Sequence, residues 1–292
     1  MPSLKDIRNR IGSVKNTQKI TKAMKMVSAA KLKRAQDRIT HLRPYALGLL
    51  GVIADIAVTK RVVHPLLSSG KDPKKILTVV VTSDRGLCGG FNSSVIREIE
   101  KRYAAEKSQY EVYDFIFVGR KVANYFENKK IFGIDKILHV AKDISYGLSN
   151  EIAEKLMAAY QHGEYDEIRL TYNEFKSAIQ QNVITEKLLP VDVNESGFVK
   201  TNSSQFSEDL IFEPEPTEII DELLNKHFAV QIYRILSESV AAEHGARMTA
   251  MENATNNAGD MIRSMTLTYN KLRQAAITKE LIEISSGAEA LN

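Results

Sequence analysis

The sequence has few of the residues that cross-link, interrupt or anchor a chain. Among 292 residues there is one cysteine, Cys88, so no disulfide can form within the chain, which fits a reducing cytoplasm. No apolar run approaches the roughly 18 residues that suggest a membrane-spanning helix. The first residues contain no apolar signal core, and we expect the protein to stay in the compartment where it is made.

Proline is scarce at both ends of the chain. None occurs between Thr217 and Gly287, and Pro44 is the only one between Ser3 and Lys60. At 1.5 Å per residue, helices over these segments would reach roughly 105 Å and 80 Å. The α/β domain expected between them would measure only about 35–40 Å across and could not cover them. The helices must therefore pack on each other and on something else, which favours a mechanical or assembly part over an enzyme.

The N-terminal segment carries the heptad pattern of helices that supercoil. Its apolar positions step alternately by three and four, and the alternation blurs between Lys15 and Ala35. Pro44 falls inside the second run, where it should bend the helix without ending it. The two periodic runs are Leu4, Ile7, Ile11, Val14 and Ile39, Leu42, Ala46, Leu49, Ile53, Ile56.

The C-terminal segment is periodic on both sides of a polar centre. The centre, Glu252 to Gly259, is rich in poor helix formers. Because both flanks are periodic, we expect one continuous helix, with Thr217 as a plausible N-cap. The flanking positions are Ile220, Leu224, Phe228, Ile232, Ile235 and Ala258, Ile262, Met265, Tyr269, Leu272, Ala276.

The middle of the chain alternates between strand and helix patterns. It follows a linker at 68–73 and ends in a polar, loop-like stretch at 192–208. The predicted strands are 76–83, 114–119, 137–140, 167–175 and 183–189, and the predicted helices are 93–107, 120–130 and 149–160. Ser93 or Ser94 would cap the first of these helices. This order predicts a Rossmann-like α/β domain of three layers. The expected division is 1–60, 74–208 and 214–292.

Topology predicts that the two end helices form an antiparallel coiled coil. One leaves the central domain near residue 57 and the other enters it near residue 217. Counting outward, residue 3 falls opposite about residue 271, and the C-terminal helix overhangs its partner by roughly 15 residues.

The net charge of +4 hides a strong asymmetry. An acidic stretch, 208–222, lies next to the central domain, away from the basic N-terminal helix, so these charges should not mainly neutralise each other. Basic helices bind nucleic acid, anionic lipid or acidic protein surfaces, although a solvated helix face is the simpler alternative. The basic residues are Lys5, Arg8, Arg10, Lys15, Lys19, Lys22, Lys25, Lys31, Lys33, Arg34 and Arg38, and the acidic ones are Glu208, Asp209, Glu213, Glu215, Glu218, Asp221 and Glu222.

No catalytic pattern emerges. The glycine-rich loop from Asp84 to Asn92 follows the first predicted strand, but neither a dinucleotide fingerprint nor a phosphate-binding P-loop occurs. A tight strand-to-helix turn that needs small residues is the simpler explanation of this loop. Cys88 has no histidine nearby, and the six histidines show no metal-ligand spacing. We predict no catalytic residue, no cofactor and no metal.

Several segments resemble the gamma subunit of F-type ATP synthase. They are Asn16–Val27, Ser83–Gly90, Glu243–Met251 and Tyr269–Thr278, and the resemblance extends over nearly the whole chain. It implies a non-catalytic rotor shaft inside a hexamer of three alpha and three beta subunits. The epsilon subunit and the ring of membrane c-subunits would bind below, and proton flow would be coupled to ATP synthesis by rotation.

The resemblance also implies partner contacts. It assigns contacts with the beta subunits to Arg247, Arg273, Gln274 and Thr278. The basic face formed by Lys22, Lys25, Lys31, Lys33 and Arg34 would meet an acidic segment of the same subunits. The loop formed by Asp84, Arg85, Gly86, Leu87 and Cys88 would face a partner. The regulatory cysteine pair of chloroplast relatives is missing, and we expect a bacterial protein on the cytoplasmic side of the inner membrane.

Two other classes stay open at this point. A basic coiled-coil protein could bind nucleic acid, although aromatic residues are not interleaved with the basic ones. A Rossmann-type enzyme would need the phosphate loop and the acid/base pair that the sequence lacks.

Overall fold

The structure, a computed structural model, describes residues 3–58, 64, 66, 72–140, 144–191 and 216–289. The side chains of residues 50, 54, 55, 57, 58, 216–218 and 287–289 are not described. The predicted linker at 68–71 and the predicted loop at 192–208 lie outside the described residues. The chain folds as two units, the coil unit (Met1–Ala29 with Arg247–Asn292) and the sheet unit (Ala30–Ala246).

The two end helices are continuous, as predicted. Helix α1 spans Leu4–Val58 and continues through Pro44. Helix α6 spans Pro216–Glu289 and continues through the poor helix formers between Glu252 and Gly259. Because α6 begins at Pro216, Thr217 lies inside the first turn and is not the N-cap, which corrects the sequence prediction. Proline is favoured at a first helical position, where a missing N–H costs nothing.

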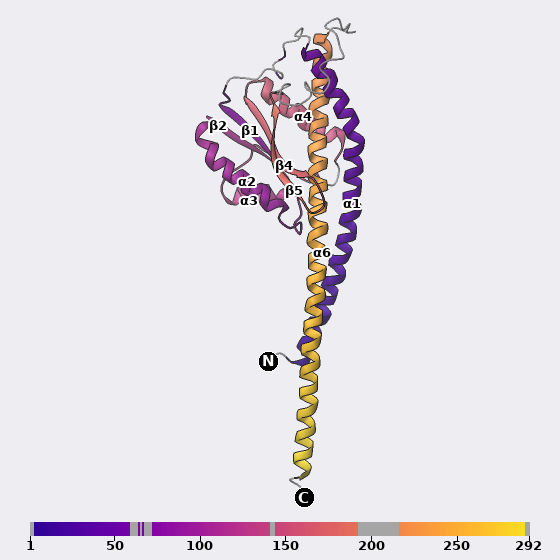
Figure 1. The fold of residues 1–292 in the computed structure, drawn as a ribbon. Helices are drawn as coiled ribbons and strands as arrows, with labels where there is room; N and C mark the ends of the chain where they lie inside the picture. The colour runs from indigo at the N-terminus through magenta and orange to yellow at the C-terminus, as the bar shows by residue number, and fades with distance from the viewer. Residues whose placement is uncertain are drawn as a thin grey trace. The chain divides into compact units, whose positions relative to one another are not determined.

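The sheet unit contains a five-stranded sheet in the order β3-β2-β1-β4-β5 (Figure 1). The strands are β1 (Lys75–Val81), β2 (Val112–Val118), β3 (Asp135–Ile137), β4 (Glu167–Phe175) and β5 (Gln181–Leu189). The first four strands are parallel, and β5 pairs antiparallel with β4. The strand predicted at 137–140 corresponds to β3, which lies slightly earlier, at Asp135–Ile137.

Three helices connect the parallel strands, namely α2 (Phe91–Glu106), α3 (Arg120–Asn128) and α4 (Tyr146–Gln161). The predicted serine cap of α2 is wrong, because Gly90 is the N-cap residue and no side chain caps this end. The hydroxyls of Ser93 and Ser94 instead donate to the carbonyls of Gly90 and Phe91, which lie three residues earlier. Serine can bond to its own backbone in this way inside a first helical turn.

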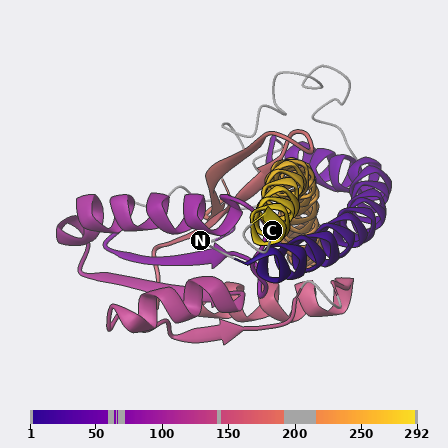
Figure 2. The ribbon, with the colours of Figure 1, turned by 90° about the horizontal axis from the view of Figure 1, so that it is seen from below.

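The sheet unit has the predicted three layers, with helices on both sides of the sheet (Figure 2). On one face, Phe115 and Phe117 of β2 pack against α2 and α3. On the other face, Val79 of β1 belongs to a larger core that includes α4 and residues of α1 and α6. Ile56 and Phe228 are fully buried in that core. The Rossmann-like α/β fold is thus confirmed.

The coil unit pairs the N-terminal part of α1 antiparallel with the C-terminal part of α6. Thr21 contacts Thr255 and Lys25 contacts Glu252, so facing residue numbers add up to about 276. Residue 3 therefore lies opposite about residue 273, roughly half a turn from the predicted partner at 271. The prediction paired residue 57 with residue 217, whose numbers add up to 274, two fewer than in the observed register.

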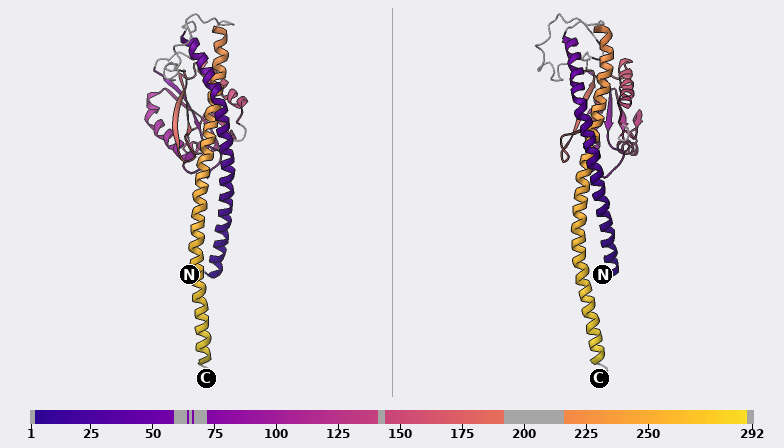
Figure 3. Two further views of the ribbon diagram at one scale, coloured as in Figure 1. Left: turned by 45° about the vertical axis from the view of Figure 1, so that its right-hand side comes forward. Right: turned by 90° about the vertical axis from the view of Figure 1, so that its right-hand side faces the viewer.

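Helix α6 extends beyond the N-terminus of α1, as both views of Figure 3 show. The seam residues Met265, Tyr269, Leu272 and Ala276 are half-buried, and every described side chain from Ile277 onward is exposed. The predicted overhang is therefore present, and we call residues 277–286 the tip. Among the described residues, no helix is long and apolar enough to span a membrane.

Candidate partner-binding surfaces

The loop after β1 caps helix α3. The backbone N–H groups of Arg120, Lys121 and Val122 donate to Asp84 Oδ1 (3.1 Å), to the Ser83 carbonyl (3.2 Å) and to Thr82 Oγ1 (3.1 Å). These are first-turn donors of α3 that have no partner within the helix. Asp84 thus has a structural task, since its carboxylate satisfies one of them.

The same loop is closed onto α2 by Asn92 and Cys88. The Asn92 side chain accepts from the Ser83 backbone N–H (3.0 Å), and its amide nitrogen donates to Cys88 Sγ (3.2 Å). Cys88 is buried and packs with Phe91, Ala242 and Ala246. The thiol is therefore a packed, hydrogen-bonded part of the loop rather than an exposed nucleophile.

Only part of the predicted partner-facing loop points outward. Arg85 is exposed, Gly86 is half-buried, and Leu87 exposes 65% of its surface. Leu87 also has a φ of 63°, a left-handed backbone conformation that is uncommon for a bulky residue. The loop thus presents Arg85 and Leu87 to the outside and uses Asp84 and Cys88 to hold its shape.

The predicted basic face is divided by the structure. Lys22, Lys31, Lys33 and Arg34 are exposed on α1. Lys25 is half-buried, and its ammonium donates to Glu252 Oε1 at 2.7 Å. Four of the five cations are therefore accessible, and Lys25 has a charge partner within its own chain.

The acidic stretch at 208–222 lies mostly outside the described residues. Asp221 accepts from His64 Nε2 at 2.8 Å, and Glu222 accepts from Lys226 at 2.6 Å. These two carboxylates pair locally, and the expected separation from the basic helix stays a prediction.

The predicted contacts on α6 also fall into two groups. Arg273, Gln274 and Thr278 are exposed near or on the tip. Arg247 is only 7% exposed. The first three can reach a partner without any rearrangement, whereas little of the Arg247 surface is available.

Sequence reasoning missed a partly buried polar cluster between α6 and the edge of the sheet. Arg234 donates to Glu186 on β5 (2.6 Å), to Tyr172 on β4 (3.2 Å) and to Glu238 one turn later on α6 (3.2 Å). Burial raises the pKa of the Tyr172 hydroxyl and that of the Glu238 carboxyl, the latter against the opposing charge of Arg234. The residues of this cluster come from β4, β5 and α6, which are too far apart in the sequence to form a recognisable motif.

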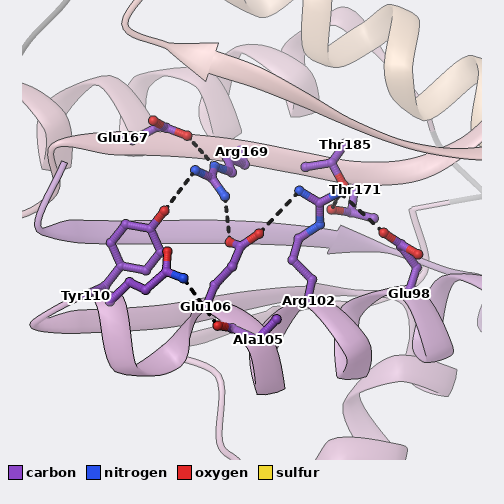
Figure 4. A network of polar contacts seen from close by, with 10 residues as sticks. Glu98, Arg102, Ala105, Glu106, Tyr110, Glu167, Arg169, Thr171 and Thr185 are labelled. Carbon is purple, nitrogen blue, oxygen red and sulfur yellow. Dashed lines mark hydrogen bonds and ion pairs between the residues drawn. The ribbon is translucent and has the colours of Figure 1, made fainter. Parts of the chain in front are cut away.

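A second missed network ties α2 to β4 (Figure 4). Arg169 donates to Glu106 at 2.8 Å, to Tyr110 at 3.3 Å and to Glu167. Arg102 continues the network along α2 toward Glu98. Among the described residues, no three His, Cys, Asp or Glu side chains gather as metal ligands would. The hydrogen bonds and ion pairs in these two clusters join helices to strands, so we interpret both clusters as structural.

The comparisons with known proteins agree with this arrangement. Residues 3–291 match the family model described as ATP synthase. The ATP synthase gamma chain of Bdellovibrio bacteriovorus is 58% identical, covering 100% of this chain and 99% of the relative. That of Chlorobaculum tepidum is 46% identical over 100% of this chain and 99% of the relative. These matches give no support to the nucleic-acid-binding alternative.

Solved structures show the same fold. A structure of the central stalk and c-ring of the Tetrahymena thermophila mitochondrial ATP synthase is similar with a TM-score of 0.63 and 29% identity, covering 80% of this chain and 99% of that one. A chain of the Euglena gracilis mitochondrial ATP synthase has a TM-score of 0.69 and 20% identity, covering 99% of this chain and 94% of that one. With relatives matched over their full length and this fold, the chain belongs to the ATP synthase gamma chain family.

Proposed function

We propose that this chain is the rotating central shaft of a proton-translocating F-type ATP synthase, and that it is not itself catalytic. The observation that carries the proposal is the tip. Its side chains are exposed among the described residues, although they include Leu281, Ile282 and Ile284, each at least 60% exposed. An apolar helix end of this kind requires a surrounding surface.

A shaft of this shape can bias its surroundings. A partner shifts a conformational equilibrium only by contacting two states unequally. The coil unit is asymmetric because α6 extends beyond α1, and because the cations from Lys5 to Lys25 lie along α1 while the tip is moderately apolar. Rotation would present different faces to each of three beta subunits, which hold the nucleotides, and so couple torque to ATP synthesis or hydrolysis.

The partners follow from the family. The proposal places the coil unit within the alpha–beta hexamer and the sheet unit against the epsilon subunit and the c-ring. The complex is membrane-associated, and we propose the cytoplasmic side of a bacterial inner membrane as its location. The functional division into 1–60, 74–208 and 214–292 belongs to the same proposal.

Native mass spectrometry of the complex purified from its source membranes tests the assembly. We expect one copy of the chain with three alpha subunits, three beta subunits and an epsilon subunit. A chain recovered alone, or with nucleic acid, would overturn the shaft proposal.

A matched pair of arginines tests the tip. Arg273 lies near the tip, whereas Arg263 lies about three turns earlier and pairs with Asp260 at 3.3 Å. Both are exposed on α6. Arg273→Ala should lower ATP synthesis in reconstituted vesicles, and Arg263→Ala should not. Both should leave stability within about 0.5 kcal/mol of the parent. Unchanged synthesis by Arg273→Ala would remove that residue from the proposed contact.

A further inference from the structure

Two heptad stripes compete on α1 between residues 18 and 28. The polar stripe consists of Gln18, Thr21, Lys25 and Ser28, and the apolar stripe consists of Ile20, Met24 and Val27. The apolar stripe lies one residue before the polar one and has the same spacing of four and three. Either stripe could therefore line a coiled-coil seam. Burying an aliphatic side chain contributes about 1.5–3 kcal/mol, so between residues 18 and 28 burial alone would favour the apolar stripe. Outside this segment, the buried Ile7 and Leu32 share the heptad positions of the polar stripe.

The structure buries the polar stripe. Thr21 is 8% exposed and Ser28 is 3% exposed, whereas Ile20 is 60% exposed and Val27 is 57% exposed. The usual pattern of apolar residues inside and polar residues outside is thus inverted here. This inversion explains why the apolar alternation blurs between Lys15 and Ala35, although the seam itself is unbroken.

The facing stretch of α6 supplies polar partners. The hydroxyls of Thr21 and Thr255 lie 2.7 Å apart, and the Gln18 amide donates to the Thr255 carbonyl at 3.3 Å. Lys25 donates to Glu252 at 2.7 Å. A Cβ on Gly259 would lie 3.1 Å from Gln18 Nε2, so the absence of a side chain there makes room for the glutamine. We call Gln18, Thr21, Lys25, Glu252 and Thr255 the polar layer.

The polar layer contributes mainly to specificity. The Lys25–Glu252 pair is partly exposed, at 37% and 47%, and such pairs contribute only about 0.2–1 kcal/mol. Buried hydroxyls, however, are costly when they lose a partner. If this part of α1 turned by about 100°, the step of one residue, Ile20 would replace Thr21 in the seam. Glu252 would then lose Lys25 as its partner. The Thr255 hydroxyl would lose Thr21, although it would keep the Met251 carbonyl at 2.7 Å. Single polar positions select coiled-coil pairings in this way.

We propose that the polar layer selects the rotational phase of α1 and thereby keeps Ile20 and Val27, two of the three residues of the apolar stripe, outside the seam. The layer is a positioning device, since it decides which face of α1 the coil unit presents. That this face then meets a surrounding subunit rests on the proposed function, whereas the phase selection does not.

The rotational phase of α1 can be measured by disulfide formation between cysteines introduced outside the polar layer. Val14 and Ile262 are half-buried seam positions whose numbers match the observed register. In a Cys88→Ser background, Val14→Cys with Ile262→Cys should form a bridge. In a turned helix Ser13 would take the place of Val14, so Ser13→Cys with Ile262→Cys is the matched reporter of the alternative phase. Both pairs are measured in the full-length chain, alone and assembled with its alpha and beta subunits.

The decisive variant replaces four members of the polar layer, Thr21, Lys25, Glu252 and Thr255, by alanine. Alanine removes the polar partners without adding a large apolar group to the present seam. We expect bridging through Ser13→Cys to rise about tenfold relative to bridging through Val14→Cys, as for a lost preference of about 1.4 kcal/mol. The control replaces four exposed residues, Lys15, Lys19, Asn256 and Asp260, by alanine and should leave the ratio unchanged.

An unchanged ratio in the four-alanine variant would overturn the proposal. If that variant loses its helical circular dichroism, the Thr21→Ala/Thr255→Ala double variant decides, with a smaller rise expected and no rise counting against the layer. Because the chain alone gives this readout, a failure of assembly would contradict the proposed function and leave the phase result standing.

Discussion

The Arg234 guanidinium on α6 donates to the Glu186 carboxylate on β5 at 2.6 Å, which ties a terminal helix to the edge strand of the sheet. Tyr172, fully buried on β4, donates to the other Glu186 oxygen at 2.7 Å. The apolar contacts between α6 and the sheet are non-directional. The arginine cluster adds direction, because its hydrogen bonds fix α6 against two particular strands.

Replacing Arg234 by methionine should destabilise the chain by about 2 kcal/mol, since Glu186 and Glu238 would lose the cation that compensates them. The value lies below that of a fully buried pair because the arginine side chain is 27% exposed. Arg263→Met is the control, at a side chain 83% exposed, and should cost less than about 0.5 kcal/mol. Urea unfolding of both variants measures the difference, and equal shifts would contradict a stabilising cluster.

His227 should make stability depend on pH. Burial first, and the charge of Arg234 second, lower its pKa to about 4, and its Nδ1 has no hydrogen-bond partner among the described residues. The folded chain therefore holds the neutral ring, whereas the unfolded chain binds a proton near the ordinary value of about 6.5. The stability that His227 contributes is present above pH 6.5 and is lost as the pH falls toward 4, by about 3 kcal/mol in total.

The comparison of two variants isolates this effect. His227→Leu should flatten the fall in the unfolding free energy between pH 6.5 and 4, because no buried group remains to be protonated there. His162→Gln, at an exposed position after α4, should keep the parent slope. A parent-like slope in His227→Leu would assign the acid sensitivity to other groups.

The fold was predictable where local patterns are strong. Strand β4 has the predicted bounds, from Glu167 to Phe175, and α3 begins at the predicted Arg120. Buried strands and amphipathic helices have such patterns because the positions that face the core are apolar and recur with the period of the element. The cap of α2 was wrong because Ser93 can bond to its own helix as well as cap it.

The candidate site was predictable only in outline. Arg273 and Leu87 are exposed, and their roles in partner binding stay predictions. Nothing in the sequence joins Arg234 to Glu186, which lies 48 positions away. The polar layer was hidden for a different reason. A search for apolar periodicity passes over Thr21 and Thr255, since their burial depends on hydrogen bonds between the two helices.

Gly119 should tolerate no side chain. It joins β2 to α3 with a φ of 96°, and an added Cβ would lie 2.2 Å from the Thr82 carbonyl oxygen. Gly163 also has a positive φ, 72°, but a Cβ there would meet open space. Gly119→Ala should therefore cost about 4 kcal/mol or prevent folding. Gly163→Ala should cost only the backbone strain of about 1–2 kcal/mol. Thermal unfolding distinguishes the two, and similar losses would contradict the close approach at Thr82.

The Leu87→Gly variant should affect the stability of the chain and its affinity for a partner differently. Its left-handed backbone costs about 1–2 kcal/mol, which Leu87→Gly would relieve, while the added chain entropy of glycine offsets about 0.5–1 kcal/mol of that gain. The variant should therefore unfold no more easily than the parent. If the exposed side chain binds a partner, the same change should weaken the affinity for the epsilon subunit by about tenfold, since a buried leucine contributes about 1.5–3 kcal/mol.

Lys130 supplies the control for this last prediction, because it is exposed and also left-handed, with a φ of 59°. Lys130→Gly should relieve similar strain without weakening assembly. Affinity for the isolated epsilon subunit and urea unfolding, measured on both variants, give the two readouts. If Leu87→Gly assembles as tightly as Lys130→Gly, the strain at Leu87 belongs to the closure of the loop by Asn92 and Cys88. If only Leu87→Gly loses affinity, the loop holds an unfavourable backbone in order to present one apolar side chain.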